Sequence, residues 1–191
     1  TMKSTDDAWI DGKGIWRLIA DVGGNFTLGT GASINLTGKG FCNKNGPGYV
    51  AGNGASHGGL GGESGVCYGR ITAPVCLGSG GESGKGGGAL ELSVAGSSTI
   101  DGLIVADGEV DGAGGSVWIT ARKISGNGSI VAAGAESISA GGGRVSVCLT
   151  GVDETFDNFA TNEVTACGSR TSNAAQSCGG AGTVYLETHE Q

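Results

Sequence analysis

Apolar and polar residues alternate within a short segment that recurs along the chain. One copy begins at Gly88 with the sequence Ala-Leu-Glu-Leu-Ser-Val, and the next begins at Gly115 with Ser-Val-Trp-Ile-Thr-Ala. Further copies begin at Gly143 and Gly182, so successive copies are 27, 28 and 39 residues apart. Strict alternation predicts strands with one buried face, and a period of this size predicts that successive copies stack on one another.

Alignment of the copies on their glycines assigns faces to the strand residues, because successive side chains of a strand point to opposite sides. Two aligned positions are apolar and predicted to face inward: Trp16, Leu90, Val117, Val145 and Val184, and then Leu18, Leu92, Ile119, Val147 and Leu186. The position between them faces outward and holds Arg17, Glu91, Trp118, Ser146 and Tyr185. A separate aligned position, which predicts another strand in each copy, holds Ile34, Ile104, Ile130 and Val164.

These patterns predict an all-β fold in which residues 1–191 form a single domain. The first copy divides into segments 14–20, 25–28 and 33–37. We therefore expect a right-handed parallel β-helix, or β-solenoid, with three strands per coil and about 27 residues per coil. Residues 1–13 would cap the first coil or lead into it, whereas residues 38–87 and 151–181 interrupt the period and would be excursions from the β-helix.

The glycine content is unusually high, with 42 glycines among 191 residues. The chain has two prolines and no apolar stripe of helical period, so glycine is expected to mark turns between strands. The glycine pairs of the 38–87 excursion would also let extended segments pack closely, since only glycine permits that backbone contact.

Six cysteines indicate disulfide bonds rather than zinc, because no C-x2-C spacing occurs. Disulfides would place the chain outside the cytosol. The favoured pairs are Cys67 with Cys76, Cys167 with Cys178, and Cys42 with Cys148, although six cysteines allow fifteen connectivities. Three sequons, compatible with secretion and glycosylation, begin at Asn25, Asn35 and Asn127.

The charge and hydropathy of the chain argue against nucleic acid and a membrane as partners. The 11 basic and 18 acidic residues give a net charge of −7 without a basic cluster, which argues against nucleic acid. No apolar run is long enough to cross a bilayer, and Thr1-Met2-Lys3-Ser4 does not resemble a signal peptide. No metal or cofactor is expected.

Several glycine-rich segments resemble those of right-handed β-helix domains in large secreted and cell-surface, adhesin-like proteins. The segments are His57 to Gly62, Tyr68 to Arg70, Gly78 to Gly81, Gly114 to Ile119, Ser125 to Ile130 and Gly182 to Leu186. The resemblance covers most of residues 14–188 and concerns architecture, because such domains share no single activity. It implies an extracellular or cell-surface structural role.

Two groups of residues offer catalytic chemistry, each beside a structural alternative. The acidic run Asp101, Asp107, Glu109 and Asp111 would suit a polysaccharide lyase or hydrolase, but its aspartates precede glycines, as in ordinary turns. His57, followed by Glu63, could act as a general base or could bond a backbone carbonyl within a glycine-rich loop. A non-catalytic role is favoured, and enzymatic activity stays open.

The outward aromatic residues offer a binding surface. Trp118 and Tyr185 would lie two coils apart, roughly 10 Å, a separation suited to stacking on two sugar rings. Glu91 and Arg17 occupy the same outward position and complete the candidate carbohydrate site. The alternative is that the excursions cover these rings.

The last copy of the repeat suggests a role in assembly. Only a first strand follows Gly182 before Gln191, so an open coil end would invite strand addition by another copy or by more of a larger chain. The leading hypothesis is a secreted, disulfide-stapled structural module of an extracellular filament or adhesin stalk. A carbohydrate-binding module is the alternative, and a lyase-like or hydrolase-like enzyme comes third.

Overall fold

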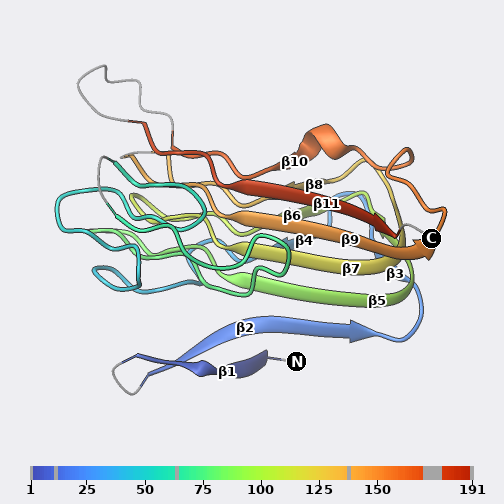
Figure 1. Ribbon diagram of the computed structural model, residues 1–191, viewed down its shortest axis with the longest axis horizontal. Helices are drawn as coiled ribbons and strands as arrows, with labels where there is room; N and C mark the ends of the chain where they lie inside the picture. Colours follow the sequence, from blue (N-terminus) through green and yellow to red (C-terminus); the bar gives the residue numbers. More distant parts are fainter. Residues whose placement is uncertain (1, 11–12, 63–64, 137–138, 170–177, 190–191) are drawn as a thin grey trace.

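The computed structural model describes residues 2–10, 13–62, 65–136, 139–169 and 178–189, and the side chains from residue 17 onward. These residues form strands, extended segments and one turn of 3₁₀ helix, η1 (Thr161–Glu163), with no α-helix among them (Figure 1). The strands are β1 (Met2–Ile10), β2 (Lys13–Val22), β3 (Phe26–Leu28), β4 (Ser33–Asn35), β5 (Ala89–Ile100), β6 (Leu103–Val105), β7 (Ser116–Ser125), β8 (Ser129–Val131), β9 (Arg144–Val152), β10 (Val164–Thr165) and β11 (Thr183–His189). No described helix is long and apolar enough to cross a membrane.

The longer strands form one sheet, here called the long sheet, in the order β1-β2-β5-β7-β9-β11. All its neighbours are parallel except β1 and β2, which are antiparallel. The predicted alignment from the second copy onward is confirmed, since Leu90 pairs with Val117, Val117 with Val145, and Val145 with Val184. The repeats therefore lie side by side in the register that their alternation predicts.

β2 departs from the predicted alignment by two residues. Leu18, and not Trp16, pairs with Leu90, and Ala20 pairs with Leu92. A shift by one residue would turn every inward side chain toward solvent, whereas a shift by two keeps each one on its face. Alternation alone therefore could not distinguish the two registers.

The short strands form a second parallel sheet, here called the short sheet, in the order β10-β8-β6-β4. Ile34 pairs with Ile104, Ile104 with Ile130, and Ile130 with Val164. The predicted alignment of these residues is confirmed in full.

The prediction of a β-helix with three strands per coil is wrong. The strands lie in two sheets, because the predicted second strands belong to the long sheet. β5 is one strand from Ala89 to Ile100, and its last residues pair with β3, where Leu28 faces Ile100. The ladder between β5 and β7 changes register between Val94 and Ser97, and such a bulge bends a strand without removing it from its sheet.

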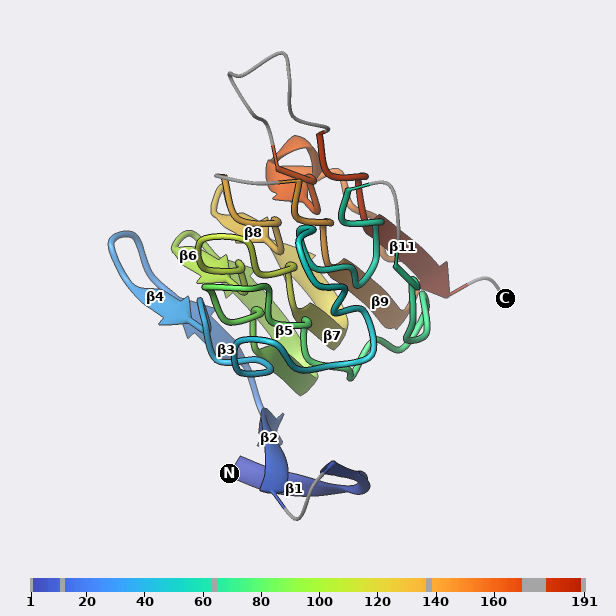
Figure 2. The same ribbon diagram turned by 90° about the vertical axis from the view of Figure 1, so that its left-hand side faces the viewer.

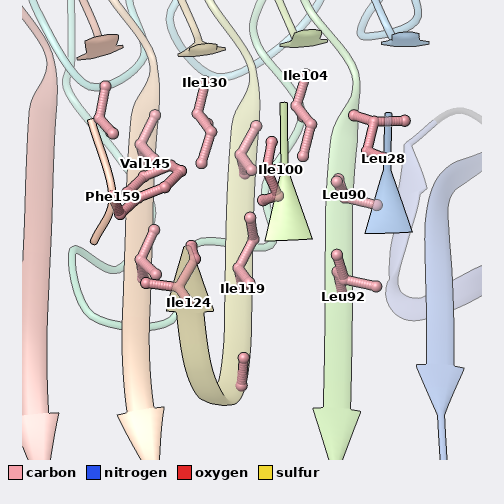
Figure 3. Close-up of a cluster of buried hydrophobic side chains, with 14 of the residues drawn as sticks. Leu28, Leu90, Leu92, Ile100, Ile104, Ile119, Ile124, Ile130, Val145 and Phe159 are labelled. Carbon is pink, nitrogen blue, oxygen red and sulfur yellow. The ribbon is translucent and has the colours of Figure 1, made fainter. Parts of the chain in front are cut away.

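One apolar core lies between the two sheets (Figure 3). Leu90, Leu92 and Ile119 reach it from the long sheet, and Ile104 and Ile130 reach it from the short sheet. All five side chains are fully or almost fully buried. Burial of each such side chain stabilises the fold by about 1.5–3 kcal/mol, so the paired rows hold the sheets together.

Extended glycine-rich segments occupy the end of the molecule opposite the strand tips, to the left in Figure 1 and toward the viewer in Figure 2. They bond through their backbones: Gly58 N–H donates to the Gly142 carbonyl at 2.9 Å, and Gly142 N–H donates to the Gly180 carbonyl at 3.0 Å. A Cβ atom on Gly58 would lie only 2.0 Å from the Gly143 oxygen. The predicted packing by backbone contact is confirmed, and we call this region the glycine layer.

The excursion from residue 38 to residue 87 belongs to the glycine layer, but disulfides do not staple it. All six cysteines are free, so none of the three predicted pairs is formed: Cys67 with Cys76, Cys167 with Cys178, and Cys42 with Cys148. Backbone hydrogen bonds such as Gly86 N–H to the Phe41 carbonyl, at 3.0 Å, hold the described part of the excursion instead.

Candidate functional site

The predicted carbohydrate-binding residues lie on the outer face of the long sheet. Trp118 pairs with Glu91 on one side and with Ser146 on the other, and Ser146 pairs with Tyr185. The predicted order of these residues is therefore correct. Arg17 is the exception, because the displaced β2 places Ile19 opposite Glu91. The Arg17 guanidinium nevertheless reaches the row, with Nη2 3.1 Å from the Glu91 carboxylate.

The excursion crosses this row. The buried Ser146 hydroxyl donates to the Thr72 carbonyl at 2.7 Å, and the Ser116 hydroxyl donates to the Cys76 carbonyl at 2.6 Å. The Arg144 Nε donates to the Tyr68 carbonyl at 2.8 Å. The segment from Tyr68 to Cys76 is thus fixed over the first residues of β7 and β9, and covers Ser146.

Trp118 and Tyr185 consequently do not share an open surface. Ser146 lies between them in the row and is buried under Thr72, while both aromatic side chains are half-buried. Burial also raises the pKa of Tyr185. The arrangement matches the alternative that an excursion covers the rings more closely than it matches a flat stacking platform.

His57 occupies the interior of the glycine layer and is fully buried. Its Nδ1 lies 2.7 Å from the Gly114 carbonyl oxygen, which can only accept, so Nδ1 carries the proton of the neutral ring. The ring also contacts Tyr68, with 4.6 Å between centroids. Burial lowers the pKa of His57 to about 4, and the alternative of a bond to a backbone carbonyl is confirmed.

The free nitrogen of His57 does not make a nucleophile pair. Nε2 and the Cys76 sulfur both lie close to Gly69, where an added Cβ would be 3.4 Å from Nε2 and 3.5 Å from Sγ. Among the described residues Nε2 nevertheless has no hydrogen-bond partner, and burial raises the pKa of the Cys76 thiol. A general base must reach the proton that it removes, so the pair lacks the geometry for thiol activation. Glu63, the predicted partner of His57, lies outside the described residues.

The aspartates of the acidic run accept hydrogen bonds from backbone N–H groups. An oxygen of Asp101 accepts the Asn127 N–H at 3.0 Å, and an oxygen of Asp107 accepts the Ala133 N–H at 2.7 Å. Asp111 is buried and accepts the N–H groups of Ser83 and Gly84. The three aspartates thus bond backbone groups of neighbouring segments rather than of their own turns. The described part of the chain holds no cluster of acidic, histidine and cysteine side chains suited to a metal ion.

All three sequon asparagines are exposed: Asn25, Asn35 and Asn127. The Asn25 Oδ1 accepts the Ser97 N–H at 2.9 Å, and the Asn35 Oδ1 accepts the Thr37 N–H at 2.9 Å. Both bonds use the side-chain oxygen, so neither engages the side-chain nitrogen to which a glycan would be attached.

The most unusual surface lies along β11, at one edge of the long sheet. Its inward residues Val184 and Leu186 are 43% and 36% exposed, although their partners in register, Val145 and Val147, are fully buried. An open groove of about 640 Å³ lies beside Leu186, between the last residues of β9 and β11, and is lined by Cys148, Leu149, Thr150, Leu186, Glu187, Thr188 and His189. The final sequence copy therefore presents core-type residues to solvent, as the sequence predicts.

The free edge of β11 also presents backbone groups. Thr183 N–H donates to the Gly143 carbonyl at 3.1 Å, so alternate residues from Thr183 direct their backbone groups toward β9. Val184 and Leu186 then direct their N–H and C=O groups away from the sheet. Such a row is a template for another strand.

No family model, curated protein or solved structure matches this chain.

Proposed function

We propose that this chain is a non-catalytic structural module that joins other chains by strand addition at β11 and contributes to an extracellular assembly, such as a filament or an adhesin stalk. The observation that carries the proposal is the exposure of Val184 and Leu186, which occupy positions that are fully buried in the preceding repeat. A further strand on this edge would remove both side chains from water.

Strand addition at this edge is favourable for two physical reasons. Covering apolar surface contributes about 25 cal/mol for each Å² removed from water, and Val184 and Leu186 supply such surface. The new strand would also pair the backbone groups of β11 that face away from β9. Glu187 is the one Asp, Glu, Lys or Arg residue of β11, so few charges oppose the approach of a partner.

The non-catalytic part of the proposal rests on how the candidate catalytic groups are used. His57 bonds the Gly114 carbonyl inside the glycine layer, and Asp101 and Asp107 bond backbone N–H groups of the next repeat. The extracellular part rests on the sequons, whose asparagines are exposed. Free cysteines remove the disulfide argument for secretion.

A charge at β11 tests the proposal. Leu186→Lys would place an ammonium group on the inward side of the free edge, where a partner strand would have to bury it. Leu103→Lys is the matched control, because Leu103 is a similarly exposed apolar residue on β6. Sedimentation velocity and electron microscopy over a concentration series should show assembly of the parent chain and of the Leu103 variant, but not of the Leu186 variant. Equal behaviour of all three chains would contradict the proposal.

Glycan binding remains a second candidate, because the register places Trp118 and Tyr185 in one outward row. Loss of the Trp118 ring by Trp118→Ala should then lower affinity for a polysaccharide at least tenfold, as expected for a stacking residue worth 1.4 kcal/mol or more. Val152→Ala serves as the control, because Val152 is an exposed residue at the C-terminal end of β9, away from this row. Unchanged retention of Trp118→Ala on an array of polysaccharides would remove this candidate.

A further inference from the structure

We propose that the partner of β11 is the β11 strand of a second copy of this chain, paired antiparallel about a twofold axis at Tyr185. This inference rests on the proposed function, since it identifies the strand that is added. Its basis is the contrast between the two edges of the long sheet, together with the complementarity of β11 to itself.

The edge at β1 is protected against strand addition. The register of β1 against β2 is broken between Ser4 and Trp9. Such an irregularity on an edge strand discourages pairing with another chain. β11 is regular from Thr183 to Glu187, so the open edge lies at this end of the sheet. Head-to-tail growth through the long sheet would require the protected β1 edge, whereas pairing of two β11 edges does not.

The backbone of β11 fits the twofold register. With Tyr185 on the axis, Val184 of each copy faces Leu186 of the other. These are the residues whose N–H and C=O groups point away from β9, so each facing pair can exchange two hydrogen bonds. Residues 184 and 186 both point inward, and the register therefore continues the inward face of one sheet into that of the other.

The side chains fit the same register. Val184 and Leu186 cover each other on the inward face, and the two Tyr185 rings meet on the outward face. Glu187 faces Thr183 of the other copy, whose hydroxyl accepts a hydrogen bond from the Arg144 Nη1 at 3.0 Å. Each Glu187 carboxylate thus approaches a guanidinium, while the two Glu187 residues stay four positions apart, roughly 13 Å.

A twofold contact of this kind uses the same surface on both copies and closes on itself. The expected unit is therefore a discrete pair with its two long sheets joined tail to tail. A longer assembly would be built from such pairs through a second contact.

Disulfide trapping tests the register. Two residues that face each other without exchanging hydrogen bonds have Cα atoms about 4.5 Å apart, which is within the range that a disulfide spans. Tyr185→Cys, made in a Cys148→Ser background to remove a neighbouring thiol, should form a covalent dimer through residue 185 under mild oxidation. Thr183→Cys in the same background is the control, because its two copies would lie roughly 13 Å apart. Peptide mapping identifies the bonded residues among the native cysteines.

The outcomes separate the register from the proposed function. Reversible association of the parent chain that is abolished by Leu186→Lys, without a bond through residue 185, would overturn the twofold register and leave strand addition standing. Equal cross-linking of the Thr183 and Tyr185 variants would also overturn it. A parent chain that remains monomeric at every concentration would overturn both proposals.

Discussion

The Nδ1 atom of His57 lies 2.7 Å from the carbonyl oxygen of Gly114, a residue 57 positions later in the chain. This bond joins the excursion to the segment that leads into β7, and the imidazole is fully buried where it is made. The neutral ring is held there, inside the glycine layer.

The burial of His57 predicts that acid destabilises the protein. The pKa of His57 is about 4 in the folded chain, below its ordinary value of 6.5, because burial disfavours the charged ring and the Arg144 guanidinium adds to this effect. The unfolded chain therefore binds a proton more readily. Stability is fully present above pH 6.5 and is lost as the pH falls toward 4, by up to about 3 kcal/mol. Urea unfolding between pH 7.5 and 4 measures the loss.

His57→Asn is the matched variant for this experiment, because the asparagine amide can donate to the Gly114 carbonyl but does not titrate in this range. The variant should lose less stability than the parent chain between pH 6.5 and 4, whatever its stability at neutral pH. Carboxylates contribute equally in both chains. Identical pH dependence of the two chains would show that His57 is not the group responsible.

The close backbone contact at Gly58 predicts that even a methyl group is not tolerated. The Cβ of Gly58→Ala would lie 2.0 Å from the Gly143 oxygen, so the two segments must separate. Overpacking of this kind costs about 1–3 kcal/mol or more. Gly23→Ala is the control, since no atom lies within 4 Å of the added Cβ, and we expect a change of at most about 1 kcal/mol. Thermal unfolding that ranks the two variants alike would contradict the packing of the glycine layer.

The hydrogen bonds of Asp111 predict that its removal destabilises one segment of the 38–87 excursion. Its carboxylate accepts the N–H groups of Ser83 and Gly84, so Asp111→Ala leaves two backbone donors without this partner. We expect a loss of about 1–3 kcal/mol and faster amide exchange at residues 83 and 84. Asp101→Ala, which removes one exposed bond to Asn127, should cost less. Unaltered exchange at residues 83 and 84 would show that Asp111 does not hold this segment.

The two inward positions of the long sheet should differ sharply in their sensitivity to truncation. Ile119 is fully buried between the sheets, so Ile119→Ala should cost about 2–5 kcal/mol. Val184 is 43% exposed at the edge, so Val184→Ala should cost less than about 1 kcal/mol in the monomer. Chemical denaturation at low protein concentration makes the comparison. A large loss from Val184→Ala would mean that β11 is covered in the isolated chain.

The alternation of residues predicted which side chains share a row and which face is buried, because the side-chain period of a strand is a property of the backbone. Alternation alone predicted the row through Ile104 in full and the row through Leu90 except at β2. Alternation could not determine how far a strand slides by an even number of residues, and this is where the prediction for β2 failed. It also could not show that a bulge keeps both halves of β5 in one sheet.

The candidate site divides in the same way. The sequence predicted the outward order of Glu91, Trp118 and Tyr185 and the exposed last copy. It left open whether the rings are covered, because that depends on where a long excursion lies. Only the tertiary structure places Thr72 over Ser146.

By itself, the sequence determined the register of the repeated strands from Gly88 onward, their inward faces, the outward order of Glu91, Trp118 and Tyr185, and the need for glycine where backbones meet. These properties depend on the local geometry of the chain and, where backbones meet, on the fact that glycine has no side chain. The tertiary structure decided the number of sheets, the free state of the cysteines, the burial of His57 and the exposure of Val184 and Leu186. Those properties depend on contacts between residues far apart in the chain, which a local pattern does not specify.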